Sequence, residues 1–134
     1  MGSKSRTTRS TGRATNGRLR FRASSRLALE RQFRSVNAAR VRKSSGPITV
    51  FARPNGLAHS RLGLSVGRRI GSAVKRNAVK RRLREAFRLN QRELPKGFDF
   101  VVHVRAHETM KTAEYADLLM ECARALEREW ARRR

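Results

Sequence analysis

The clearest pattern in the chain is an alternation of apolar and polar residues that gives way to a helical period at Ser72. Before Ser72, residues 61–67 alternate as in a half-buried strand, whose apolar side is formed by Leu62, Leu64 and Val66. The strand covers about residues 57–67 if residues 57–60 also belong to it, which the pattern leaves open. A glycine-bracketed turn at residues 67–71 ends this strand, and Ser72 stands at the position of a helix N-cap. The helix that follows has an apolar side formed by Val79, Leu83, Ala86 and Phe87.

Upstream of this segment, the pattern predicts a helix and a strand joined by a loop. The helix covers residues 24–40, is capped by Ser24 or Ser25, and has an apolar stripe formed by Leu29, Phe33 and Val36. Residues 43–47 have the serine, glycine and proline composition of a loop. Residues 48–53 then alternate as in a strand.

Downstream, the pattern predicts one strand and one long helix. Residues 94–97 contain a proline and a glycine and end the central helix. Residues 98–105 form a strand whose apolar face carries Phe98, Phe100, Val102 and Val104. The last helix covers about residues 112–132, with a core stripe of Tyr115, Leu119, Cys122, Leu126 and Trp130. These elements predict an α+β fold in which helices pack largely on one face of a sheet.

The length of 134 residues fits one domain, which we place at residues 25–134. Residues 1–24 are rich in Arg, Ser and Thr and contain no acid, so we expect a disordered basic arm there. This arm lacks the apolar segment of a secretory signal, although an organelle transit peptide has a similar composition. The single cysteine, Cys122, excludes an internal disulfide and suits a reducing compartment such as the cytoplasm.

The charge balance narrows the kind of partner. The formal net charge is +23, which indicates a polyanion, with nucleic acid favoured over an acidic membrane surface. Residues 1–90 hold 24 Lys and Arg against 2 acids, whereas residues 91–134 hold 9 against 8. The binding surface is therefore expected in the first two thirds of the chain.

Basic residues also recur every four positions along the central helix, beside its apolar side, at Arg76, Lys80, Arg84 and Arg88. Like charges at this spacing destabilise a helix by about 0.2–0.5 kcal/mol per pair, which favours an anionic partner over a merely solvated face. The small strand residues Gly63, Ser65 and Gly67 could form the floor of a groove beside this row. That groove requires the helix to cover the face of the strand that carries the small residues.

The ordered combination of glycines, basic residues and one asparagine in residues 61–84 resembles the signature of the protein subunit of bacterial ribonuclease P. That family has a strand of the form R-x-G-x-S-V, two basic residues, I-G, A-V and then R-N-R-x-K-R-x-x-R. The second arginine of R-N-R is Ala78 here, so its RNA contact is not expected. The resemblance covers residues 25–132. It implies a four-stranded sheet in the order αβββαβα, similar to the second domain of ribosomal protein S5, with the missing strand expected from a split of residues 57–67 at residues 58–60.

The resemblance implies an endoribonuclease subunit that promotes removal of the 5′ leader from precursor tRNA. In that family the RNA subunit performs the hydrolysis with Mg²⁺, so no catalytic residue, metal site or protein-bound cofactor is expected in this chain. The implied partners are the catalytic RNA and precursor tRNA, with no membrane and no required protein partner. By residue-by-residue transfer and by position, the contacts expected with the catalytic RNA are Arg68, Arg69, Lys75, Arg76, Asn77, Lys80, Arg81 and Arg84. The residues expected in the leader cleft are Phe33, Phe51, Arg53 and Ser65.

Several of these residues have a plainer interpretation. Position alone makes Phe33 a core aromatic, and the second aromatic that the family often has four residues later is Asn37 here. Phe51 shares a strand face with Arg53, so it could stack on a base if that face lines the cleft. Cys122 is expected to be a buried apolar residue, and the three histidines are too scattered to predict a metal site. The alternative function is a structural RNA-binding protein, such as a ribosomal protein or an RNA chaperone.

Overall fold

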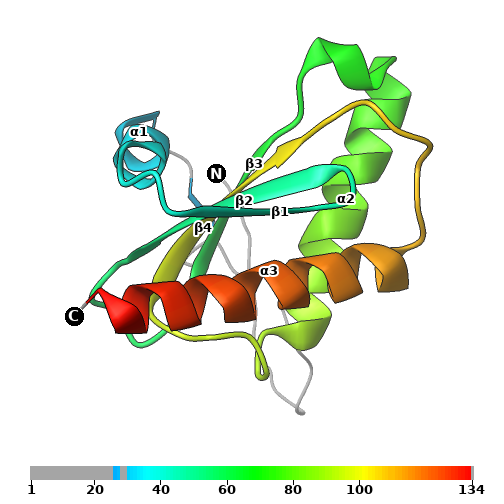
Figure 1. Cartoon of the computed structure of the whole chain (residues 1–134). Helices are drawn as coiled ribbons and strands as arrows, with labels where there is room; N and C mark the ends of the chain where they lie inside the picture. The colour runs from blue at the N-terminus through cyan, green and yellow to red at the C-terminus, as the bar shows by residue number, and fades with distance from the viewer. Residues whose placement is uncertain (1–25, 28–29, 134) are drawn as a thin grey trace, which may run out of the picture.

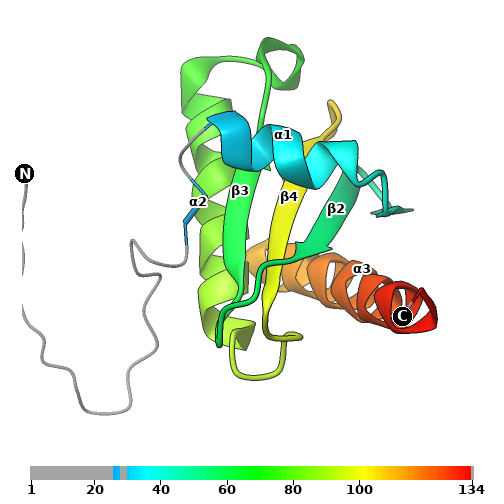
Figure 2. The same ribbon diagram turned by 90° about the vertical axis from the view of Figure 1, so that its left-hand side faces the viewer.

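A four-stranded sheet separates helix α1 on one face from helices α2 and α3 on the other, seen edge-on in Figure 1 and face-on in Figure 2. The computed structural model describes residues 26–27 and 30–133. In chain order the elements are α1 Glu30–Ala38, β1 Arg42–Ser45, β2 Ile48–Pro54, β3 Arg61–Ser65, the short 3₁₀ helix η2 Arg68–Ile70, α2 Ala73–Asn90, β4 Phe98–Val104 and α3 Thr112–Arg132. The predicted α+β class and αβββαβα order are confirmed. The predicted arm of residues 1–24 lies outside the described residues.

The strand pairing decides which residues share a face. The strand order is β1-β2-β4-β3, with β2 antiparallel to both β1 and β4, and β3 parallel to β4. Val101 at the centre of β4 is the partner of Phe51 on β2 and of Gly63 on β3, so these three residues point toward α1. The next residue, Val102, is the partner of Val50, and both point toward α2 and α3.

The main core lies between the sheet and the two helices α2 and α3. Its largest fully buried side chains include Ile48, Leu62, Leu83, Phe100, Tyr115, Leu119 and Leu126. Trp130 closes one end of this core, where its indole nitrogen donates a hydrogen bond of 2.9 Å to the carbonyl of Ala52. The stripes predicted for the central and last helices are therefore confirmed, because they supply most of the helical side of this core.

Of the two sheet faces, the one toward α1 is covered by the described residues only in its centre. A small cluster of buried residues, Leu27, Val36 and Val101, lies there with the partly buried rings of Phe33 and Phe51 packed against it. Helix α1 has nine residues and therefore leaves polar sheet residues uncovered on both of its sides. The two faces of the sheet thus differ in how completely they are closed.

Two sequence-based predictions of local structure were wrong. The missing strand is β1, Arg42–Ser45, which overlaps the predicted loop at residues 43–47, and residues 57–60 contribute no strand. Strand β1 has three exposed residues followed by one half-buried residue, so no apolar alternation marks it. The predicted helix of residues 24–40 is shorter at both ends. It begins at Glu30, since Arg26 forms an isolated bridge with Leu62, and it ends at Ala38, because Arg40 adopts a left-handed backbone with φ of 59°. The predicted caps Ser24 and Ser25 lie outside the described residues.

Candidate nucleic-acid interface

The start of α2 presents several cations on a well-defined turn. The side chain of Ser72 caps the helix and accepts a hydrogen bond of 3.2 Å from the backbone nitrogen of Lys75, as the sequence predicts. Just before it, Gly71 has a φ of 140°, a conformation that side chains rarely adopt. The turn between β3 and α2 holds Arg68 and Arg69 on η2, and both are exposed.

The basic row of α2 lies at the border of the main core. Val79 and Leu83 are completely buried, and the neighbouring Arg76, Lys80 and Arg84 are half-buried as a result. We use the name α2 basic face for the predicted RNA-contacting set, which comprises Arg68, Arg69, Lys75, Arg76, Asn77, Lys80, Arg81 and Arg84. Three of its members, Asn77, Arg81 and Arg84, line one hollow of about 430 Å³ together with Arg26 and Glu85.

The electrostatics of this face favour an added anion. Burial, and secondarily the nearby charge of Arg26, lower the pKa of Arg84, so its charged form is less stable here than in water. The Nε of Arg76 is buried and has no hydrogen-bond acceptor among the described residues. Arg88 differs from the rest of the predicted row, because its Nε donates a hydrogen bond of 2.9 Å to Glu85. An added anion would complement Arg84, whereas Arg88 already has a carboxylate partner in Glu85.

Gly63 and Ser65 of β3 lie on the other face of the sheet from α2, and Gly67 lies beyond the end of the strand. A Cβ placed on Gly63 would come within 2.7 Å of Cζ of Phe33 and 3.1 Å of Cβ of Leu27. The segment that contains Leu27 and α1 therefore packs closely against the backbone of β3 at Gly63. Leu62, on the opposite face of β3, belongs to the main core. The predicted groove between the basic row and a floor of small residues is therefore wrong. Glycine is needed at position 63 because the ring of Phe33 takes the space of a side chain.

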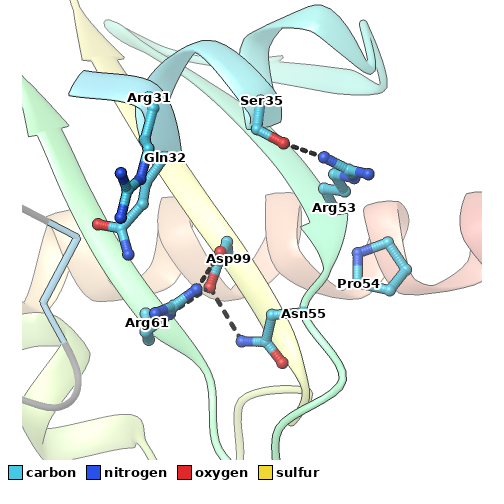
Figure 3. A pocket seen from close by; sticks show the side chains of 8 residues that line it. All are labelled: Arg31, Gln32, Ser35, Arg53, Pro54, Asn55, Arg61 and Asp99. Atoms are coloured by element: carbon cyan, nitrogen blue, oxygen red, sulfur yellow. Dashed lines mark hydrogen bonds and ion pairs between the residues drawn. The ribbon is translucent and has the colours of Figure 1, made fainter. Parts of the chain in front are cut away.

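One side of α1 borders a polar hollow of about 430 Å³, which we call the arginine hollow (Figure 3). Arg31, Gln32 and Ser35 of α1 lie along it, as do Pro54 and Asn55; its other lining residues are Arg53, Arg61 and Asp99. The carboxylate of Asp99 accepts two hydrogen bonds from Arg61, of 2.8 and 2.7 Å, and one of 2.9 Å from Asn55. Arg53 is exposed and donates a hydrogen bond to the hydroxyl of Ser35.

A second hollow of about 570 Å³, which we call the aromatic hollow, is lined by Asn37, Arg40, Arg42, Phe51 and His103. The ring of Phe51 is half-buried and meets the ring of His103 edge-on, with 5.1 Å between centroids. The guanidinium of Arg42 lies 5.8 Å from the centre of the Phe51 ring, within the range of a cation–π contact. His103 shares a hydrogen bond of 3.1 Å with the side chain of Asn37, and burial lowers the pKa of its imidazole.

The four predicted cleft residues all lie on the α1 face of the sheet, although no single hollow is lined by all four. Phe51 lines the aromatic hollow and Arg53 lines the arginine hollow. Phe33 packs in the apolar cluster between them, in agreement with its interpretation as a core aromatic, and remains partly exposed. Ser65 is half-buried and is the strand partner of His103.

Sequence reasoning missed His103, Arg40 and Arg42 as lining residues of the aromatic hollow. The alternation of residues 98–105 did contain the signal for His103, because it places this residue on the face opposite Val102 and Val104. The contact of His103 with Phe51 on the neighbouring strand could not be derived from that alternation. For Arg40 and Arg42, nothing in the sequence beyond their charge indicated a place at this hollow.

The described residues hold no group of three or more His, Cys, Asp or Glu side chains placed to bind a metal ion. Cys122 is buried in the core, as predicted, and burial raises the pKa of its thiol to about 11. His107 has a structural contact with α3, because its Nε2 lies 2.6 Å from the hydroxyl of Tyr115 and forms a hydrogen bond with it. Within the described part of the chain, no helix is long and apolar enough to cross a membrane.

Comparison with known proteins agrees with this architecture. The family model described as Ribonuclease P matches residues 21–129. The chain is 45% identical over 111 residues to the ribonuclease P protein component of Methylococcus capsulatus, covering 82% of this chain and 81% of that one. It is 48% identical over 87 residues to the component of Chromobacterium violaceum, covering 64% and 71% respectively.

Two solved structures have the same fold. The ribonuclease P protein of Thermotoga maritima matches with a TM-score of 0.66 at 36% identity, covering 72% of this chain and 92% of that one. The protein of Staphylococcus aureus matches with a TM-score of 0.67 at 25% identity, covering 75% and 94%. The motif, the fold and the relatives agree, and the chain belongs to the family of ribonuclease P protein components.

Proposed function

We propose that this chain binds the catalytic RNA of ribonuclease P through the α2 basic face and holds the 5′ leader of precursor tRNA on the α1 face of the sheet. The family supplies the coarser statement, that the chain is a component of an endoribonuclease that contains RNA. In this proposal the RNA subunit performs the hydrolysis with Mg²⁺, and the protein supplies binding and positioning.

The observation that carries the leader site is the aromatic hollow. Its volume of about 570 Å³ accommodates a nucleobase, and the half-buried ring of Phe51 offers a stacking surface there. Stacking of a base on an aromatic ring contributes about 1–3 kcal/mol and accepts any base, as a site for varied leaders requires. Arg40 and Arg42 at the same hollow supply positive charge for the phosphates.

The α2 basic face suits the catalytic RNA for a different reason. Its cations are spread over η2 and the first three turns of α2, which gives a broad surface without an aromatic ring among its eight members. Such a surface binds phosphates independently of base sequence, and its affinity falls steeply with salt. The desolvated guanidinium of Arg84 would gain from a phosphate oxygen.

The test is reconstitution of leader cleavage with a bacterial ribonuclease P RNA at low Mg²⁺. The protein should strongly stimulate cleavage of precursor tRNA at the 5′ end and should be inactive without the RNA. Cleavage by the protein alone would place the chemistry in the chain and overturn the proposal. Tight RNA binding without stimulation by any of several bacterial ribonuclease P RNAs would favour a structural RNA-binding role instead.

A matched pair of variants separates the α2 basic face from general charge. Lys80→Ala with Arg84→Ala should weaken binding to the catalytic RNA and reduce the salt slope of the affinity by about 1 for each phosphate that the variant no longer binds. The control, Arg124→Ala with Arg128→Ala, removes the same charge from exposed positions of α3. Equal losses of affinity in the two variants would contradict a specific role for the α2 basic face.

A further inference from the structure

A fourth basic hollow lies at the β1 edge of the sheet, and it shares only Arg40 and Arg42 with the leader site proposed above. This edge hollow has a volume of about 330 Å³ and lies between the α1–β1 connection and the C-terminal end of α3. In Figure 1 strand β1 runs between α1 above and α3 below, and α1 and the C-terminal end of α3 both lie at the left of the view. Its charged lining residues are Arg40, Arg42, Lys43, Glu129, Arg132 and Arg133.

The charges of the edge hollow do not cancel. Glu129 is its single acid and accepts hydrogen bonds from Arg132 and from Arg133, the latter at 3.2 Å. Among the described residues, Arg40, Arg42 and Lys43 take part in no ion pair, and all three are exposed. The hollow therefore has excess positive charge and room for an anionic group.

The edge hollow adjoins the aromatic hollow. Arg40 and Arg42 line both of them. The strand register explains this, because Arg42 is the partner of Phe51 on the α1 face, whereas Lys43 is the partner of Val50 on the opposite face. Successive cations of β1 thus carry positive charge around the edge of the sheet.

The backbone of Arg40 gives an independent indication of function. Arg40 has a φ of 59° and follows the last turn of α1, a position where glycine is usual because a side chain is strained there. The chain has an arginine at this position despite the strain. Strained residues of this kind are concentrated at functional sites, which favours a binding role for the guanidinium of Arg40.

We propose that the edge hollow binds the phosphate backbone of the precursor tRNA leader beyond the nucleotide held in the aromatic hollow. The inference rests on the proposed function, since it extends the leader site from the α1 face around the edge of the sheet. Unpaired arginine and lysine side chains suit phosphates. A protein partner would usually require a buried apolar anchor, and the exposed large apolar residues of the described chain, Leu57, Val74 and Leu89, line none of this hollow.

The test measures the affinity of the reconstituted holoenzyme for precursor tRNAs whose leaders are lengthened one nucleotide at a time. The variant Lys43→Ala with Arg133→Ala changes residues that line the edge hollow but not the aromatic hollow. It should bind the shortest leaders as the wild type does and lose about tenfold in affinity for the longest. Its salt slope with long leaders should fall by about 2, since each of the two missing cations would have bound about one phosphate. The control with the same charge change is Arg124→Ala with Arg128→Ala.

The other outcomes have distinct meanings. A loss of affinity that is the same for short and long leaders would assign the edge hollow to the catalytic RNA or mature tRNA, and would overturn the inference. Unchanged affinity for all leaders would also overturn the inference. The cations at the edge of β1 would then serve only to prevent edge-to-edge pairing with another sheet. The wild-type cleavage reaction tests the proposed function separately. If the wild-type protein does not stimulate leader cleavage, the proposed function itself fails.

Arg40→Gly gives a second, independent test, because strain and binding predict opposite changes. The variant should be at least as thermally stable as the wild type, since glycine adopts the left-handed backbone without strain. Its affinity for long-leader precursor tRNA should nevertheless fall about fivefold or more. A lower melting temperature with unchanged affinity would assign Arg40 a structural role and contradict its part in the leader path.

Discussion

The two faces of the sheet are built from the same four strands and yet differ in how completely they are buried and in how polar they are. The face toward α2 and α3 is closed, and Ile48, Val50 and Ala52 of β2 are each 0% exposed there. The face toward α1 alternates with it along the same strand, and it carries Thr49, Phe51 and Arg53, none of them fully buried.

The difference arises from the size of the covering elements. Helices α2 and α3 have 18 and 21 residues and pack on each other as well as on the sheet, whereas α1 has nine residues. Two long helices suffice to exclude water from one face, and a short helix covers only the centre of the other. We infer that the closed face provides stability and that the incompletely covered face provides the leader site.

The largest effect is expected from the closed face. Leu83→Ala should lower the free energy of unfolding by about 2–5 kcal/mol, because it leaves a cavity at a completely buried position. Urea titration followed by circular dichroism measures the change. Val74→Ala on the same helix is the control, since Val74 is 81% exposed and its truncation should lower stability by less than about 0.5 kcal/mol. Similar losses of stability for the two variants would contradict the assignment of the core.

Phe51→Ala should show the opposite separation of stability and binding. The variant should fold, because Phe51 is only half-buried, and should lose about 1–3 kcal/mol of the holoenzyme's preference for precursor over mature tRNA. Phe51→Tyr, which keeps the ring, should retain that preference. Affinities for the two tRNAs measure the effect, and a retained preference in the folded alanine variant would return Phe51 to a purely structural role.

Gly63→Ala tests how closely α1 approaches the sheet. The added Cβ would lie 2.7 Å from the ring of Phe33 and 3.1 Å from Leu27, so we expect a loss of about 1–3 kcal/mol in unfolding free energy. Phe33→Leu in the same chain should recover part of that loss by removing the ring. A double variant with the full sum of the two separate losses would show that the two residues do not interact.

His103 should give the smallest effect, as a pH dependence. Burial lowers the pKa of His103, so below about pH 6.5 the unfolded chain binds more protons than the folded one, and stability falls as the pH falls. His103→Gln should weaken this decline between about pH 6.5 and the lower folded-state value. Thermal melts over that range measure it, and an identical pH profile in the variant would exclude His103 as a contributor.

The closed face could be predicted from the sequence almost completely. The last helix was predicted at about residues 112–132 and is α3, Thr112–Arg132, because its long stripe of large apolar residues has a helical period. Strand β4 was predicted equally well, since Phe98, Phe100 and Val102 must share one buried face. Strong periodicity comes from burial, so the parts of the chain that are buried most completely are the parts that sequence patterns indicate best.

The open face could be predicted only in part, for the same physical reason. Strand β1 is polar throughout and is stabilised by its pairing with β2, which no periodicity records. The alternation of β3 places Gly63 and Leu62 on opposite faces but does not say which helix covers which face. The predicted groove was wrong for this reason, since α2 covers the face of Leu62 and not that of Gly63. His103 joins Phe51 through pairing between β2 and β4, a contact between residues 52 positions apart.

The assignment of the leader to the α1 face can be tested most directly by photocrosslinking. A precursor tRNA with a photoreactive nucleotide in its leader would be bound to the reconstituted holoenzyme, irradiated, and the crosslinked peptide identified by mass spectrometry. We expect crosslinks to β2 and β4 around Phe51 and His103, and to α1 near Asn37. Crosslinks confined to α2 would contradict this assignment, because they would place the leader on the surface that we assign to the catalytic RNA.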